Sequence, residues 1–241
     1  MSIASIGRPA RPSPRTLGRI IAILFLVTIL LGIVAQLLIS DRLISFRDPA
    51  RTVSNILTNQ SLYGAAFSLY MIELAAQITS TVLLFHLLKP VNERVATLAL
   101  VFGLVGCTVK TFSRVFYLAP LVILQHGALD GLAPTQVGAM TLTMLTVNDR
   151  GAGAAMAFFG FETVLEGWLV LRSTFLPRWL GALMIVAGIG WLTFLSPTFG
   201  YAAFDVVGLI ALVGSVATIG RLLLKGVDED RWRALATASS P

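Results

Sequence analysis

Residues 95–124, VATLALVFGLVGCTVKTFSRVFYLAPLVIL, decide the fold of this chain. The stretch is long enough to cross a bilayer, for which a helix needs about 20 consecutive, mostly apolar residues. Lys110 and Arg114 nevertheless lie well inside it, one helical turn apart. Because each charge costs about 3 kcal/mol to insert near the bilayer centre, neither side chain is expected to face lipid. The stretch therefore predicts a membrane helix with a charged face that points into the protein.

The composition of the whole chain indicates the same class of protein. Of its 241 residues, 56% are hydrophobic and 12% are charged, and the apolar residues fall in long runs. A soluble domain carries about twice this charged share. The strands of a membrane barrel are about ten residues long and alternate in polarity, which does not fit such runs. We therefore expect an all-α, polytopic membrane protein.

Six apolar stretches predict a single bundle of transmembrane helices. They comprise residues 17–39, 62–88, 95–124, 151–171, 176–195 and 202–224. The resulting membrane domain, residues 17–225, lies between a disordered basic tail at residues 1–16 and a C-terminal tail at residues 226–241. Asp48 followed by Pro49 is typical of a helix start and predicts a short surface helix in the first long outer loop. A second surface helix is predicted to begin near Pro134, in the other long outer loop.

The distribution of basic residues predicts the orientation in the membrane. Six spans place both termini on one side, and twelve Lys and Arg residues fall on that side. They are Arg8, Arg11, Arg15, Arg19, Lys89, Arg94, Arg172, Arg178, Arg221, Lys225, Arg231 and Arg233. The other side has four, which are Arg42, Arg47, Arg51 and Arg150. By the positive-inside rule, both termini are expected in the cytoplasm, with the protein in the cell (inner) membrane.

Acidic side chains at the depth of Lys110 and Arg114 predict a shared polar interior. Glu73 and Glu162 each lie about eleven residues, or about 16 Å, from the predicted outer end of their spans, near the bilayer centre. Residues four apart in sequence lie on the same face of a helix, and three pairs of polar residues in these spans have this spacing. The candidate site residues are Glu73 with Gln77, Lys110 with Arg114, Glu162 with Glu166, and Asp205 at the level of Arg114. We expect them to surround one centre.

Three functions are compatible with this interior. Intramembrane ionisable groups often mark ligand or ion paths, which favours a cavity that binds or translocates a small molecule or a proton. The candidate site has four acids and two bases, so at least one carboxyl group is expected to hold a proton or to pair with a bound ligand. This excess also favours a binding or translocating cavity. Alternatively, the charges only lock the bundle of a structural or partner-binding protein. A third reading is an intramembrane enzyme that uses Glu73 or Glu162 as acid or base.

Several classes of function receive no support from the sequence. The net charge of +6 could attract nucleic acid, but the basic residues cluster at span ends, where topology accounts for them. His86 and His126 lie too far apart to form one metal site, and the chain has one cysteine, Cys107. No nucleophile elbow, P-loop or zinc-protease motif is present. We expect a lipid bilayer as partner, no cofactor and no nucleic acid, and the chain gives no indication of its oligomeric state.

Two turns on the predicted cytoplasmic side resemble those of a known membrane family. They are LLKPVN at residues 87–92 and LRSTFLPRWLG at residues 171–181, together with Asp48-Pro49 and LTN at residues 57–59. The chain is similar, over about residues 17–227, to the bacterial family catalogued as domain of unknown function 4386. The resemblance implies a cell-membrane protein of six helices and carries no established activity.

Overall fold

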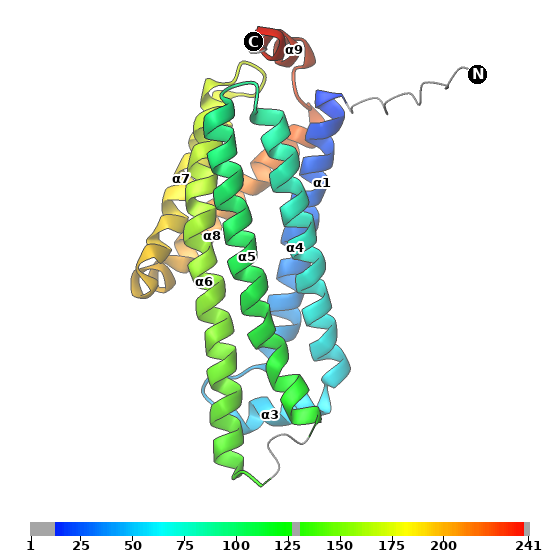
Figure 1. Cartoon of the computed structure of the whole chain (residues 1–241), viewed down its shortest axis with the longest axis vertical. Coiled ribbons are helices and arrows are strands. Elements are labelled where there is room, and N and C mark those ends of the chain that lie inside the picture. Colours follow the sequence, from blue (N-terminus) through cyan, green and yellow to red (C-terminus); the bar gives the residue numbers. More distant parts are fainter. Residues whose placement is uncertain (1–12, 127–130, 239–241) are drawn as a thin grey trace, which may run out of the picture.

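The computed structural model describes residues 13–126 and 131–238, and all regular elements within them are helices. The prediction of an all-α protein with six helices of membrane-spanning length is confirmed. Most of the long helices run side by side along the long axis of the molecule (Figure 1). The elements are α1 (Pro14–Ile33), the π-helix η1 (Val34–Ser40), α2 (Asp41–Leu43), α3 (Pro49–Thr58), α4 (Gln60–Leu88), α5 (Glu93–Gln125), α6 (Pro134–Arg172), α7 (Arg178–Trp191), the 3₁₀ helix η2 (Leu192–Leu195), α8 (Pro197–Leu224) and α9 (Glu229–Ala238).

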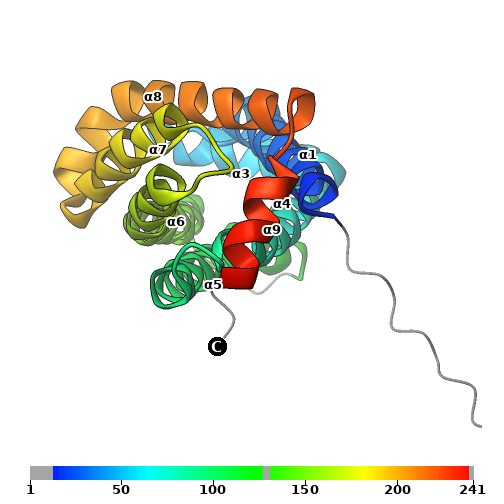
Figure 2. The same cartoon turned by 90° about the horizontal axis from the view of Figure 1, so that it is seen from above.

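The six long helices form a closed ring in chain order. α1 packs on α4, and α4, α5, α6, α7 and α8 each pack on the next, while α8 returns to α1. Figure 2 shows this ring from above, with α8 crossing the others at a steep tilt. Because every helix contacts its neighbours in the chain, side chains from all six reach the middle of the bundle.

Large apolar side chains cover the outside of the ring. Phe112 on α5 is 66% exposed, Val206 on α8 is 65% exposed and Leu224 at the end of α8 is 83% exposed. Exposed apolar side chains over such an area suit hydrocarbon and not water. The helices satisfy their own backbone hydrogen bonds, as a chain in lipid must. The chain is therefore a multi-pass membrane protein.

Four glycines bring α6 and α7 into backbone contact. Gly160 and Gly167 of α6 face Gly188 and Gly181 of α7 respectively. A Cβ atom at Gly181 would lie 2.5 Å from the backbone oxygen of Gly167, and one at Gly160 would lie 3.0 Å from that of Gly188. Small residues are what allows membrane helices to approach this closely. The close packing holds the acidic face of α6 in a fixed rotation.

The prediction of a separate surface helix near Pro134 and a span starting at residue 151 is wrong. A helix does begin at Pro134, but α6 continues without interruption for 39 residues to Arg172. Asn148, Asp149 and Arg150 do not end it, because each has partners within the bundle. Asn148 accepts a hydrogen bond from Arg114, the hydroxyl of Tyr201 donates to the backbone oxygen of Asp149, and Arg150 stacks on the Tyr201 ring.

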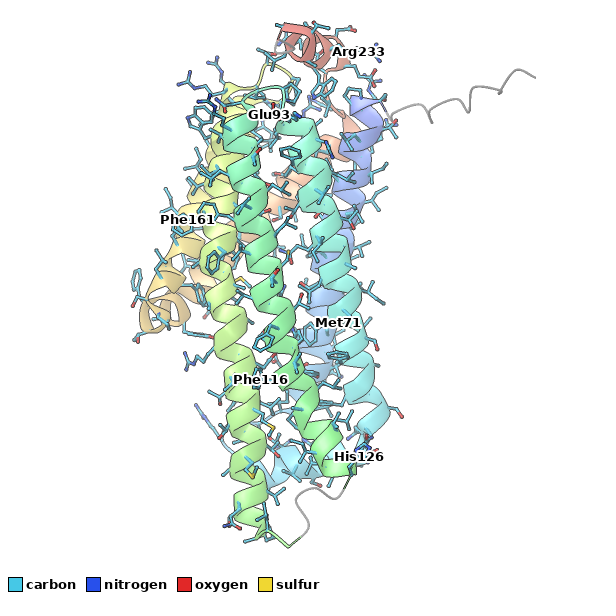
Figure 3. The ribbon with its side chains drawn as sticks, viewed as in Figure 1. Met71, Glu93, Phe116, His126, Phe161 and Arg233 are labelled. Atoms are coloured by element: carbon cyan, nitrogen blue, oxygen red, sulfur yellow. The ribbon has the colours of Figure 1, made fainter. Side chains whose placement is uncertain are left out.

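The two ends of the bundle are closed differently. At one end lies α3, whose predicted start is confirmed: Pro49 is its first residue and the side chain of Asp48 accepts a hydrogen bond from the Arg51 nitrogen. At the other end lies α9, in the segment predicted as a C-terminal tail, and the Trp232 indole donates to the Leu87 backbone oxygen at 2.8 Å. Figure 3 places Arg233 and the turn at Glu93 at this same end.

The first helix is longer than predicted at its start. It begins at Pro14, within the predicted tail, because the side chain of Ser13 accepts a hydrogen bond from the Thr16 nitrogen and caps the helix. Residues 1–12 of that predicted tail lie outside the described residues. Past Ile33 the helix continues as η1, so its first turns and its π-helical end belong to one long segment.

Candidate functional site

A cavity of about 290 Å³ lies at the centre of the ring. Side chains from all six long helices line it. Phe161, labelled in Figure 3, marks its level along the bundle, because the next residue, Glu162, lines the cavity. Its charged and amide side chains are Glu73, Gln77, Lys110, Glu162 and Glu166. The structure therefore brings together five of the seven predicted site residues.

Lys110 and Glu73 form a buried ion pair across this cavity. The Lys110 Nζ lies 2.5 Å from Oε1 of Glu73, and both side chains are at most 10% exposed. The prediction that Lys110 or Arg114 pairs with Glu73 or Glu162 is confirmed for this pair. The second oxygen of Glu73 and the Oε1 of Gln77 are buried and have no hydrogen-bond partner in the described residues. Two acceptors from α4 are thus left for a donor in the cavity.

The carboxyl group of Glu162 lies against both α4 and α5. The hydroxyl of Thr81 donates to its Oε1 at 2.9 Å. Gly103 leaves the space for the carboxyl group, because a Cβ atom at that position would lie only 2.1 Å from Oε1 of Glu162 and 2.8 Å from Thr81. The absence of a side chain at Gly103 is therefore what allows α4, α5 and α6 to meet at this acid.

Glu162 and Glu166 are not balanced by a base. They lie one turn apart on α6, and they are 6% and 8% exposed. Within the described part of the chain, neither forms a salt bridge. Lys110, the one base that lines the central cavity among the described residues, is already paired with Glu73. Two carboxyl groups at low dielectric without a counter-charge favour a proton or a cation between them.

Arg114 does not join the central cavity, so the prediction of a single interior is wrong for this residue. Its guanidinium carbon lies 3.7 Å from the centre of the Tyr70 ring, and its Nη1 donates to the Asn148 side chain at 3.1 Å. It lines a second cavity of about 280 Å³ toward the end that carries α3. Residue spacing placed Arg114 one turn from Lys110, but its guanidinium lies against Tyr70 of α4 and Asn148 of α6.

Asp205 also lies apart from the others. It is exposed on α8, between Phe204 and Val206, which are 47% and 65% exposed, and it lines neither cavity. Counting residues from the start of a span gives the depth of a side chain but not the rotation of its helix. The rotation of α8 leaves Asp205 on its exposed face.

Several polar residues of the two cavities were missed by sequence reasoning. Thr81 had a signal, because it continues the Glu73 and Gln77 face by one more turn. For Asn148, the sequence indicated only that the chain returns to the membrane near this position. Ser40 and Gln36 had no signal, because their direction depends on the π-helix η1. Within the described residues, no three His, Cys, Asp or Glu side chains lie close enough to hold a metal ion.

Comparison with known proteins places the chain in a family. Residues 20–226 match the family described as domain of unknown function 4386 (DUF4386). The chain belongs to this family. The resemblance seen in the turns at residues 87–92 and 171–181 is therefore confirmed. An uncharacterized protein from Archaeoglobus fulgidus is 26% identical to this DUF4386 chain over 150 residues, which cover 62% of this chain and 76% of the relative. No solved structure matches the chain.

Proposed function

We propose that the central cavity binds a proton or a small cation at Glu162 and Glu166 and that the protein carries it across the cell membrane. The observation that supports this most is the charge balance of the cavity. Three carboxyl groups face one ammonium group, and the Lys110–Glu73 pair accounts for only one of the three. A charge left unpaired in a low-dielectric interior costs several kcal/mol, which a bound proton or cation removes.

The position of the acids supports a role in transport. Glu162 lies ten residues from the end of α6 at Arg172, or about 15 Å, which is half the thickness of a bilayer's hydrocarbon core. Binding sites of transporters commonly lie near the bilayer midplane. The surrounding oxygens of Glu73, Gln77 and Thr81 are ligand types that suit a proton or a hard cation.

The test is uptake by the purified protein in liposomes, followed with an internal pH dye and with sodium or potassium added outside. Wild-type protein is expected to take up protons or one of these cations. Glu162→Gln is expected to keep the fold, because the amide still accepts from Thr81, and to abolish uptake. Glu93→Gln is the control, since Glu93 is an exposed acid paired with Lys89. Absence of uptake in wild-type protein, or unchanged uptake in Glu162→Gln, would contradict the proposal.

A second function is favoured by one contact. The Lys110–Glu73 pair joins α5 to α4 in the middle of the bundle, as a charge that only locks helix order would do. On that reading, Glu162 and Glu166 hold their protons permanently and the cavity passes nothing. Glu162→Gln would then change neither uptake nor the pH dependence of melting, whereas transport requires both to change.

We also propose that both termini face the cytoplasm. The start of α1, α9 and the turn before α5 lie at one end of the bundle (Figures 1 and 3), and the twelve-to-four distribution of Lys and Arg supports this end as the cytoplasmic one. A cysteine introduced at Gln136 should react with an impermeant thiol reagent in intact cells, and one at Asn92 should react only after permeabilisation. Native Cys107 is 1% exposed and serves as the silent background. Labelling of the Asn92 position in intact cells would reverse the orientation.

A further inference from the structure

The second cavity lies between η1, α4, α5 and α6, on the α3 side of the Lys110–Glu73 pair. Met71 and Phe116, labelled in Figure 3, are sequence neighbours of its lining residues Tyr70 and Tyr117 and mark its level. None of its lining residues belongs to the central cavity. It is therefore a separate site with its own chemistry.

Arg114 is the basic residue of this cavity and is only 6% exposed. Its contacts leave it without a counter-ion: one nitrogen donates to Asn148, and the plane stacks on Tyr70. Its Nε is buried and has no acceptor among the described residues. A buried guanidinium with an unused N–H requires an acceptor, and its fork geometry fits a carboxylate.

A network of hydroxyl groups lines the same cavity and includes Tyr70, the ring on which Arg114 stacks. Ser40 Oγ lies 3.1 Å from the Tyr70 hydroxyl and 2.9 Å from the Tyr117 hydroxyl, and the Tyr70 hydroxyl donates to Gln36 at 2.7 Å. Gln36 and Ser40 both come from η1, and π-helical turns of this kind are frequent at functional sites. The network fixes the Tyr70 ring on which Arg114 stacks, so the guanidinium is held in place before a ligand arrives.

Two acids also line the cavity and limit which anion fits. Asp41 accepts a hydrogen bond from Gln36 at 2.8 Å, and Asp149 is followed by Arg150. Neither forms a salt bridge with Arg114 in the described residues. Their negative charges disfavour a multiply charged anion such as phosphate more strongly than a singly charged one, which has to lie at the guanidinium of Arg114 and away from both acids.

We propose that the second cavity binds a small monocarboxylate through the guanidinium of Arg114. The carboxylate accepts from Nε and a terminal nitrogen of Arg114, in the bidentate arrangement that Arg favours. This site is independent of the proton or cation site proposed for the central cavity. A carboxylate at Arg114 needs no transport activity to be detected.

The test measures saturable binding of acetate to purified protein, by calorimetry and by thermal stabilisation, with methylammonium and inorganic phosphate as comparison probes. Acetate is expected to bind, and phosphate and methylammonium are expected to bind at least about tenfold more weakly. Arg114→Gln is expected to weaken acetate binding by about tenfold or more, since a charge-assisted pair is lost. Arg150→Gln is the matched control, because Arg150 also stacks on a tyrosine, Tyr201 at 4.3 Å, but lines neither cavity.

A second variant keeps the test decisive if Arg114→Gln does not fold. Ala152 lines the cavity, and Ala152→Leu fills space without touching the charges, so it should abolish acetate binding while the protein still melts cooperatively. Loss of acetate binding in this variant and its retention in Arg150→Gln support the proposal. Absence of saturable acetate binding in wild-type protein, binding that survives Ala152→Leu, or preferential binding of methylammonium would overturn it.

Discussion

Lys110 and Arg114 lie one turn apart on α5, yet they enter different cavities and are neutralised differently. Lys110 has a carboxylate partner 2.5 Å away in a cavity with two further acids. Arg114 has an amide and an aromatic face, and no carboxylate within salt-bridge distance in the described residues. Like charges on one helix can therefore differ in energy and in role, because the neighbouring helices decide the partner.

The largest expected effect tests the Lys110 side of this comparison. Lys110→Met or Glu73→Gln leaves a buried charge without its partner and should lower the free energy of unfolding by about 3 to 5 kcal/mol. The double variant should lose much less than the sum of the two. Denaturation in detergent measures all three. The exposed pair Lys89 and Glu93, 2.8 Å apart, is the control, and its removal should cost less than about 1 kcal/mol. Strictly additive losses for Lys110 and Glu73 would refute the pairing.

The second-largest effect concerns Glu162, which has no basic partner among the described residues because Lys110 pairs with Glu73. Gly103→Ala places a Cβ atom only 2.1 Å from Oε1 of Glu162, so the carboxyl group is expected to move away from Thr81. The expected loss is about 1 to 2 kcal/mol, the value of a hydrogen bond to an ionisable group. Gly208→Ala is the control, because a Cβ atom there meets nothing within 4 Å. Equal melting of the two variants would show that the Thr81 contact does not position Glu162.

A smaller effect is expected on the Arg114 side. Arg114→Met removes one hydrogen bond and the contact with Tyr70, but it also removes a buried cation that has no carboxylate partner. These terms offset, and the free energy of unfolding should fall by at most about 1 kcal/mol. The same detergent denaturation checks it. A loss as large as that of Lys110→Met would mean that Arg114 is ion-paired after all, which would erase the difference between the two cavities.

The smallest effect contrasts both buried cavities with Glu229, a partly exposed charge at the α9 end. The Ser13 hydroxyl donates to Glu229 at 2.7 Å and, with smaller contributions from the Arg15 backbone and Arg233, lowers the pKa of Glu229. Because the folded pKa lies below the unfolded one, this stabilisation is present above the ordinary pKa of about 4.3 and is lost as pH falls through the lowered value. Ser13→Ala should therefore reduce the melting temperature slightly more at neutral than at acidic pH. In a Glu229→Gln background that pH dependence should vanish, and its persistence would point to another group.

The sequence was sufficient for much of the fold, and the reason is physical. Runs such as residues 95–124 can be stable only across a bilayer, and Asp48 with Pro49 starts α3 by local hydrogen bonding alone. The prediction of a separate surface helix after Pro134 failed, because the polar residues 148–150 resemble a membrane boundary. Their partners on α5 and α8 are known only from the structure. A helix interruption cannot be inferred from residues whose partners lie on other helices.

The candidate site was predictable in depth but not in direction. Spacing brought Glu73, Gln77, Lys110, Glu162 and Glu166 to one level, and the ring of helices brings them to one cavity. Spacing could not show that Asp205 is exposed, because the rotation of α8 depends on its packing against α7 and α1. The network around Ser40 was also out of reach, since it depends on the π-helical geometry of η1.

Infrared spectroscopy tests most directly whether the carboxyl pair of α6 exchanges a proton or a small cation, as we propose. Difference spectra of the purified protein are recorded between about pH 5 and pH 8, the range in which a functional carboxyl group titrates, with and without sodium or potassium. We predict a protonated-carboxyl band that changes with pH or with the cation in wild-type protein and in Glu93→Gln, and that is lost or shifted in Glu162→Gln. A spectrum without any such change, or one that is the same in Glu162→Gln, would contradict the account.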